Sequence, residues 1–161
     1  MLSFFWTAFI FSNSLKNGDQ SKQASGKVVE IVQTFANAFG IEIQEEGEGL
    51  TIDSVSLFIR KGAHMTEFAI LGILSFFSLS QFIKGPKTLY SLFYPLIVAI
   101  SDELLQLGTP GRSGQVTDVL IDMAGATIAV FVVFFIVKLH KNKTDKSDSA
   151  VKSEKVYCLK K

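Results

Sequence analysis

The stretch VTDVLIDMAGATIAVFVVFFIVKL, residues 116–139, decides the fold of this chain. It is 24 residues long, and a helix that crosses the hydrocarbon core of a bilayer needs about 20 predominantly apolar residues. Two acids, Asp118 and Asp122, nevertheless lie in its first two turns. An ionisable group at the centre of a bilayer costs roughly 2.5–3.5 kcal/mol, so such groups in a membrane helix usually have a use. The stretch therefore predicts a membrane-spanning helix with one polar end.

Two further apolar runs, about 63–83 and 88–107, have a similar length. A fourth, Leu2 to Phe11, is too short to span as it stands and lacks the basic flank and cleavage site of a signal peptide, so we interpret it as a foreshortened first helix. A mean hydropathy of +0.33 and 15 phenylalanines are high for a soluble domain. We therefore expect an all-α membrane protein, a small bundle of about four transmembrane helices.

An amphipathic segment separates the first two apolar runs. Val28, Val32, Phe35 and Phe39 recur at helical spacing, and Gly40 follows where a C-cap belongs. The segment predicts a helix that either packs on the core or lies on the outer leaflet.

Charge asymmetry predicts the orientation. Segment 12–56 holds three lysines against seven acids, whereas 138–161 holds eight lysines against three acids. Lys and Arg mark the cytoplasmic side, so the tail and the turn Lys84-Gly-Pro-Lys87 belong inside. We expect a multi-pass protein of the cell membrane with both termini cytoplasmic, the amphipathic segment outside, a transmembrane domain at 1–140 with its core at 57–139, and a disordered Lys-rich cytoplasmic tail at 141–161.

In this topology the polar residues of the apolar runs fall at one depth, near the outer end. His64 and Glu67, Asp102 and Gln106, and Asp118 and Asp122 are each spaced to share a helical face. Three such faces would form a polar pocket that opens to the outside. The candidate site residues are Lys61, His64, Glu67, Asp102, Glu103, Gln106, Arg112, Asp118 and Asp122.

Such a pocket has several chemical uses. Carboxylates and a histidine can hold a divalent metal or perform acid–base chemistry, and the cations can clamp an anionic headgroup. A structural alternative is that Arg60, Lys61 and Arg112 pair with Glu67, Asp102 and Asp118 to make these charges tolerable in the bilayer. The residues alone leave metal, cofactor and catalysis open, and we expect no nucleic-acid partner.

The same positions carry a resemblance. The motifs Lys61-x-x-His64-x-x-Glu67, Asp102-Glu103-x-x-Gln106, Pro110-Gly111-Arg112 and Asp118-x-x-x-Asp122-x-x-Gly125-Ala126 resemble the VanZ-like family of bacterial membrane proteins. The likeness covers about 60–130, and Phe9-Ile10-Phe11-Ser12-Asn13-Ser14 is similar to that family's first helix and exit. Ala129 departs from it, since a second glycine is usual there.

The resemblance implies a link to low-level teicoplanin resistance in Gram-positive bacteria, without an assigned chemistry. Three function classes follow. The first is a protein that binds or alters the display of an amphiphile at the outer leaflet, either a cell-wall lipid intermediate or the lipoglycopeptide itself. The second is a membrane enzyme acting on a lipid-linked phosphate, and the third is a structural or accessory protein without a ligand. We favour the first, with the lipid bilayer as a partner in every case and the oligomeric state open.

Overall fold

The computed structural model describes residues 2–16, 18–40, 43, 51–80, 87–110 and 115–159. The fold is all-helical, as predicted. The described elements are α1 (Leu2–Ser14), α2 (Gly18–Ala38), α3 (Ile52–Ser80), α4 (Lys87–Leu107) and α5 (Val116–Leu159).

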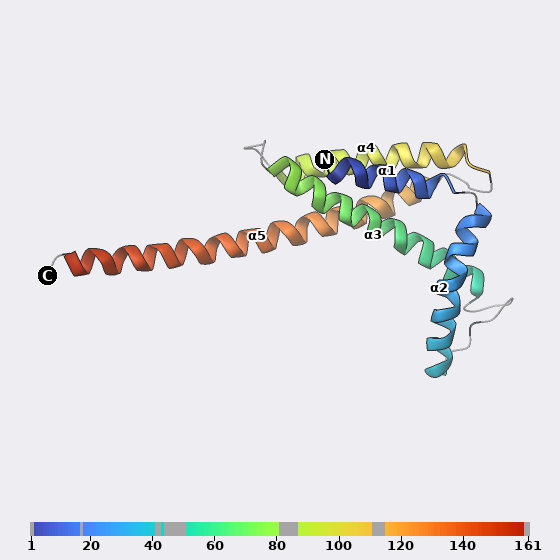
Figure 1. The fold of residues 1–161 in the computed structure, drawn as a ribbon, viewed down its shortest axis with the longest axis horizontal. Coiled ribbons are helices and arrows are strands. Elements are labelled where there is room, and N and C mark those ends of the chain that lie inside the picture. The colour runs from blue at the N-terminus through green and yellow to red at the C-terminus, as the bar shows by residue number, and fades with distance from the viewer. Residues whose placement is uncertain are drawn as a thin grey trace.

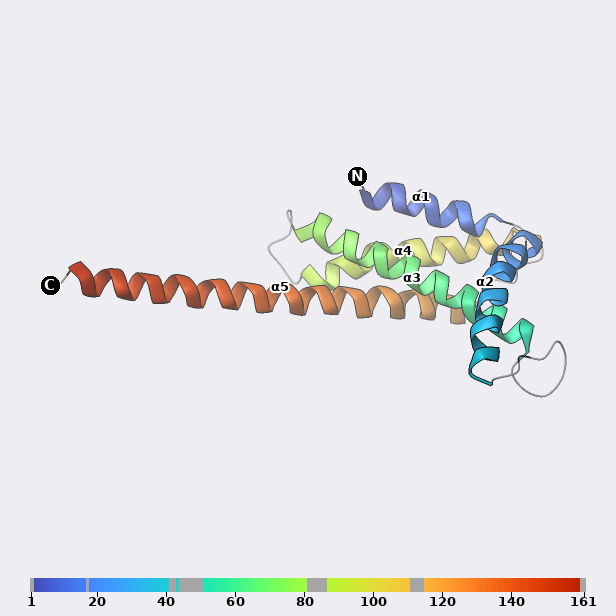
Figure 2. The same ribbon diagram turned by 60° about the horizontal axis from the view of Figure 1, so that its bottom comes forward.

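Four of these helices lie alongside one another, and the fifth lies across them (Figure 1). α1, α3, α4 and the first half of α5 form the bundle, with successive members running in opposite directions, and α2 crosses the bundle at one end (Figure 2). The end of α1, the start of α3, the end of α4 and the start of α5 therefore meet at the end that α2 crosses. We call this the α2 end of the bundle.

Three helices are long and apolar enough to cross a membrane: Ile52–Leu79, Lys87–Leu107 and the Val116–Thr144 part of α5. Only 22–28 % of the most apolar window of each is buried inside the protein, so their apolar surface faces outward, as it does in lipid. α1 is 13 residues long, about 20 Å at 1.5 Å per residue, which is short of a full span. The prediction of an all-α membrane bundle is confirmed, with three full-length spans and a shorter α1 beside them.

α3 begins at Ile52, well before the start near residue 63 that hydropathy predicts. The signal missed is a capping pair. The backbone N–H of Ser54 donates to Thr51 Oγ1 (3.3 Å), and the backbone N–H of Thr51 donates to Ser54 Oγ (3.0 Å). Reciprocal capping of this kind satisfies free donors at a helix start. The added turns carry Arg60 and Lys61 within the helix rather than before it.

α5 also differs from the prediction, because it continues as a helix to Leu159 where a disordered tail is expected from 141 onward. The residues after 139 include no glycine or proline. A helix already nucleated in the bundle propagates through such a sequence at little cost. The turn at 84–86 and the segment at 111–114, to which parts of the topology and site predictions belong, lie outside the described residues.

The closest helix pair is α3 with α5. A Cβ at Gly72 would lie 2.9 Å from the Ala126 carbonyl oxygen, and a Cβ at Gly125 would collide with the Met65 carbonyl. Ala126 itself is fully buried. Small residues permit this close contact, as they do in other membrane bundles.

α2 ends at Ala38, and Gly40 follows with a φ of +74°, the left-handed conformation of a helix C-cap. The helix packs on the start of α3 through Val29, which is buried, and through a Ser25–Ser56 hydroxyl contact of 2.9 Å. The predicted amphipathic helix is thus present and begins ten residues earlier, at Gly18. Val28, Ile31, Phe35 and Phe39 on its apolar side are exposed.

Candidate functional site

Each spanning helix has one face that points into the bundle, and this face changes from apolar to polar toward the α2 end. In α4, buried Pro95, Val98 and Ala99 are followed one turn later by buried Asp102 and Glu103 and then by Gln106. α3 places His64 one turn before buried Phe68, and α5 places Asp122 one turn before buried Ala126. The same 3.6-residue period that builds the core therefore delivers the polar side chains to a common interior position.

His64, Asp102 and Asp122 meet there. One ligand-type atom from each, an imidazole nitrogen and two carboxylate oxygens, lie within 4.8 Å of one another. Asp102 is fully buried, Asp122 is 2 % exposed, and His64 is half-buried. Three different helices thus supply one compact cluster, which we call the inner cluster.

The Asp102 carboxylate has unequal surroundings. Its Oδ2 accepts a hydrogen bond from Gln106 Nε2 at 2.9 Å, which fixes the orientation of the group along its own helix. Its Oδ1 is buried and has no hydrogen-bond partner among the described residues. A buried carboxylate oxygen without a donor is costly, so a proton, a hydrogen-bond donor or a cation at this atom would stabilise the protein.

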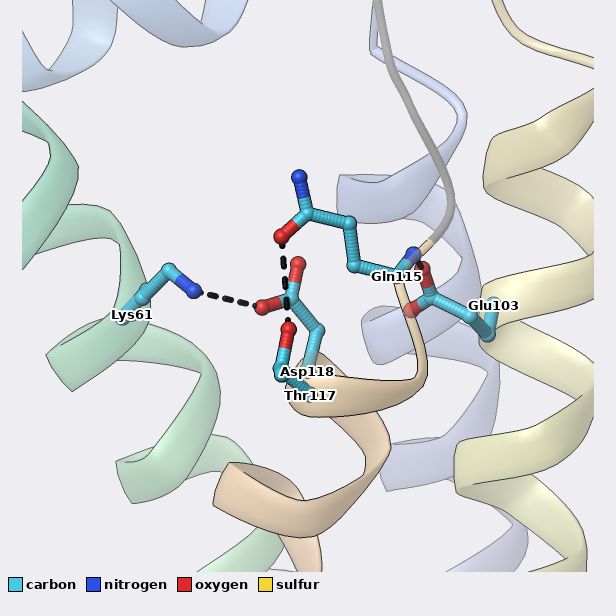
Figure 3. Close-up of polar contacts among 5 residues, drawn as sticks. All are labelled: Lys61, Glu103, Gln115, Thr117 and Asp118. Carbon is cyan, nitrogen blue, oxygen red and sulfur yellow. Dashed lines mark hydrogen bonds and ion pairs between the residues drawn. The ribbon is translucent and has the colours of Figure 1, made fainter.

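An ion pair lies one helical turn closer to the α2 end. Lys61 Nζ donates to Asp118 Oδ1 at 2.8 Å, joining α3 to the start of α5, and both side chains are 30 % exposed (Figure 3). Lys61 precedes His64 by three residues and Asp118 precedes Asp122 by four. The site therefore has two layers, a half-exposed ion pair over a buried cluster.

Glu103 lies near the Lys61–Asp118 ion pair. Its Oε1 accepts the backbone N–H of Gln115, the residue that precedes α5 (Figure 3). This bond ties the start of α5 to α4, and the Gln115 side-chain oxygen in turn accepts from the Thr117 hydroxyl at 3.3 Å. Glu103 therefore holds the entry to α5 in place.

Glu67 is held from α1, which the sequence did not indicate. Asn13 Nδ2 donates to Glu67 Oε1 at 2.8 Å, while Asn13 Oδ1 accepts from Lys16 Nζ at 2.8 Å. Trp6 Nε1 donates to the Glu67 backbone carbonyl at 2.8 Å. The signal available in the sequence was a single amide, Asn13, at the end of an otherwise apolar helix.

The candidate residues therefore fall into groups. His64, Asp102 and Asp122 converge, with Gln106 bound to Asp102; Lys61 and Asp118 pair; Glu103 binds the Gln115 backbone; and Glu67 turns to α1. Of the ion pairs considered from the sequence, Lys61 with Asp118 is present. Arg112 lies outside the described residues.

Comparison with protein families adds the decisive observation, since a model described as VanZ/LLP1 matches residues 1–138. The chain belongs to the VanZ-like family. Searches among curated proteins and among solved structures found no match for this VanZ-like chain. Its membrane character rests on the three apolar spans as well as on the family match.

The geometry of this VanZ-like site limits its chemistry. Asp118 is already occupied by Lys61, so the outer layer offers a neutralised pair rather than a free cation. The inner cluster offers two acids and an imidazole, which can exchange a proton or ligate a cation. α2, which packs on the start of α3 through the Ser25–Ser56 contact, carries the exposed apolar residues Val28, Ile31, Phe35 and Phe39.

Proposed function

We propose that this VanZ-like protein binds an amphiphile of the bacterial cell envelope at the outer leaflet, alters how it is displayed, and thereby contributes to low-level teicoplanin resistance. The observation that carries the proposal is the meeting of His64, Asp102 and Asp122, which come from α3, α4 and α5. An amphiphile needs a polar contact and an apolar contact at one interface. The half-exposed Lys61–Asp118 pair beside the inner cluster provides the first, and the exposed apolar side of α2 provides the second.

The α2 helix suits this role. Val28, Ile31, Phe35 and Phe39 project from one side, whereas Glu30 and Asn37 lie on the opposite side. A helix of this pattern lies in the plane of a membrane with its apolar side among the acyl chains. An acyl tail inserted beside it would bring its headgroup to the half-exposed layer of Lys61 and Asp118, directly above the inner cluster.

The test compares two drugs in a susceptible Gram-positive host. Teicoplanin carries an acyl chain that partitions into the outer leaflet, and vancomycin lacks one. Expression of the full chain is expected to raise the inhibitory concentration of teicoplanin modestly and to leave that of vancomycin almost unchanged. Asp102→Ala or His64→Ala is expected to abolish the rise at equal protein levels, with the exposed His140→Ala as the matched control.

Equal protection against both drugs would point to a general envelope effect and would contradict the proposal. Protection that survives in variants expressed at normal levels would remove Asp102 and His64 from the site.

The orientation has a test of its own. The Lys-rich 138–161 region is expected on the cytoplasmic side and the acidic 12–56 region outside. A reporter fused after Lys161 should therefore behave as cytoplasmic, and one inserted near Gly47 as external. The reverse pattern would move the α2 end to the inner face and exclude an outer-leaflet ligand.

A second candidate function is a membrane enzyme acting on a lipid-linked phosphate, and the donor set of the inner cluster favours it. An imidazole beside two carboxylates is suited to general base catalysis or to metal-assisted hydrolysis. Phosphate release from a polyprenyl phosphate in mixed micelles, present in the native protein and lost in His64→Ala, would support an enzyme. Absence of turnover with unchanged drug protection would leave the binding role.

A further inference from the structure

We propose that His64, Asp102 and Asp122 form a binding site for one divalent first-row transition metal ion, with Zn²⁺ preferred. The three donor atoms come from α3, α4 and α5 and lie within 4.8 Å of one another. Zn²⁺ binds imidazole nitrogen and carboxylate oxygen at about 2.0–2.2 Å, so two ligands of a tetrahedral zinc ion lie about 3.3–3.6 Å apart. Side-chain rotations that bring the donor atoms about 1–1.5 Å closer together seat the ion.

Charge is the second argument. Asp102 and Asp122 are 0 % and 2 % exposed, and two carboxyl groups so close together in a buried setting cannot both stay ionised unless a positive charge lies between them. Lys61, the cation of the layer above, is bound to Asp118 at 2.8 Å. A dication between the two acids removes the repulsion and supplies the partner that the buried Asp102 Oδ1 lacks among the described residues.

The kind of ion follows from the donor atoms. Mg²⁺ and Ca²⁺ are held by oxygen ligands, whereas an imidazole nitrogen favours Zn²⁺ and its first-row neighbours. Affinity in a mixed nitrogen and oxygen site rises from Mn²⁺ through Fe²⁺ toward Zn²⁺. We therefore expect Zn²⁺ to bind more tightly than Mn²⁺, and both more tightly than Mg²⁺ or Ca²⁺.

The surroundings of the ligands support the assignment. Gln106 Nε2 holds Asp102 Oδ2 at 2.9 Å, the kind of supporting hydrogen bond that orients a ligating carboxylate. The close contact of Gly125 with Met65 fixes α5 against α3 immediately beside Asp122 and His64. The ligands are thus placed by rigid helices before an ion arrives.

Three protein ligands leave at least one position of a Zn²⁺ ion open, as in catalytic zinc sites. That position would accept an exogenous oxygen. If the protein binds an envelope amphiphile as proposed above, an oxygen of its phosphate headgroup has the chemistry for this position. This last step alone rests on the proposed function.

Zinc titration of the full chain in detergent tests the site. The protein carries an affinity tag other than polyhistidine, is stripped with a chelator, and is titrated with Zn²⁺ by calorimetry. We expect one ion per chain, with affinity reduced at least about 10-fold in His64→Gln, Asp102→Asn and Asp122→Asn. The matched control is His140→Gln, which replaces the other histidine at an exposed position of α5.

The site is overturned if all three cluster variants bind Zn²⁺ as tightly as the native protein does. It is also overturned if the native protein does not bind Zn²⁺ stoichiometrically. Tighter binding of Mg²⁺ or Ca²⁺ than of Zn²⁺ overturns the choice of ion. If a cluster variant fails to fold, the site can still be tested with Co²⁺. Co²⁺ added to the native protein and to His140→Gln should give the same visible spectrum, that of an ion with nitrogen and oxygen ligands. A spectrum of free aqueous Co²⁺ overturns the site.

Thermal unfolding gives an independent measurement. An ion that binds only the folded protein raises its unfolding temperature, so Zn²⁺ should stabilise the native chain and His140→Gln but not Asp122→Asn. These readouts do not involve teicoplanin. If the native protein binds zinc but His64→Ala still protects against the drug, the proposed function is contradicted and the metal site stands. If His64→Ala loses protection but the native protein binds no zinc, the metal site is contradicted and the proposed function stands.

Discussion

α5 and α2 both pack on α3, but in different ways. Along α5 the backbones touch, because a Cβ at Gly125 would collide with the Met65 carbonyl and one at Gly72 would lie 2.9 Å from the Ala126 carbonyl oxygen. Along α2 the contact is a buried Val29 and a hydroxyl pair, and a Cβ at Gly26 would meet nothing within 4 Å.

The two contacts meet two different requirements of a site in a membrane protein. The α3–α5 contact determines where His64 and Asp122 lie, so it tolerates no added volume. The α2 contact only attaches an amphipathic helix to the α2 end, and the apolar side of that helix is left for another partner. Substitutions in the α3–α5 contact should therefore change the stability of the protein more than substitutions in the α2–α3 contact, and for a different physical reason.

The largest effect is expected from Gly125→Ala. The added methyl must displace the α3 backbone at Met65, and overpacking of this kind typically costs about 1–3 kcal/mol and occasionally more, so we expect a cost of about 3 kcal/mol against backbone that cannot move aside easily. We expect a large drop in the thermal unfolding temperature of the protein in detergent.

Gly26→Ala in α2 is the matched control. Because its Cβ meets nothing within 4 Å, it should be neutral or stabilise by up to about 1 kcal/mol through helix propensity. Equal destabilisation by the two changes would show that the two contacts do not differ in the way described.

Lys61→Met is expected to have the next largest effect, because it leaves Asp118 without its 2.8 Å partner. The pair is 30 % exposed, so the loss should fall between the ranges for exposed and buried pairs, about 1–3 kcal/mol. Adding Asp118→Asn should restore most of the stability in chemical or thermal unfolding. Failure of that second change to rescue would mean that Lys61 acts on another group.

A smaller effect is expected from Asn13→Ala. The variant removes the amide that donates to Glu67 Oε1, and a hydrogen bond to a charged group contributes about 1.5–3 kcal/mol, less where water can replace it. We expect a loss of about 1–2 kcal/mol in unfolding measurements. Ser3→Ala, which removes an exposed Ser3–Ser78 contact at the other end of α1, should cost under about 0.5 kcal/mol. A similar cost for both would assign no special role to Asn13.

Changes on the apolar side of α2 should alter stability least. In a chain with Cys158→Ser, a polarity-sensitive dye on Phe35→Cys should show the blue-shifted emission of an apolar environment in liposomes, whereas the dye on Asn37→Cys should report water. The stability of either variant should change by less than about 0.5 kcal/mol, since Phe35 is 64 % exposed. Identical emission at the two positions would contradict an in-plane placement of α2.

The elements with strong periodicity were predictable. The long apolar runs and the amphipathic stripe ending at Gly40 appear as predicted, because the periodicity of hydropathy is a local property of the sequence. The start of α3 was missed because Thr51 and Ser54 cap a helix without changing its hydropathy.

The site was predictable in part for a related reason. Helical spacing put Asp102 with Gln106 and Asp118 with Asp122 on common faces, but it carried no information about which face meets which. That Asp118 lies with Lys61 while Asp122 lies with His64 and Asp102 depends on how α5 is offset along α3. The role of Asn13 depends on the docking of α1, which a lone amide in an apolar helix does not specify.

Because α5 is one unbroken helix, a small movement at its start would produce a larger movement at its far end. From Gly125 to Leu159 the helix contains 35 residues and is about 51 Å long at a rise of 1.5 Å per residue. A tilt of about 5° at the glycine contact would move the far end by about 4 Å at this length. A change of a fraction of an ångström beside Asp122, such as the seating of an ion or a headgroup, would therefore be magnified at the Lys-rich end of the chain.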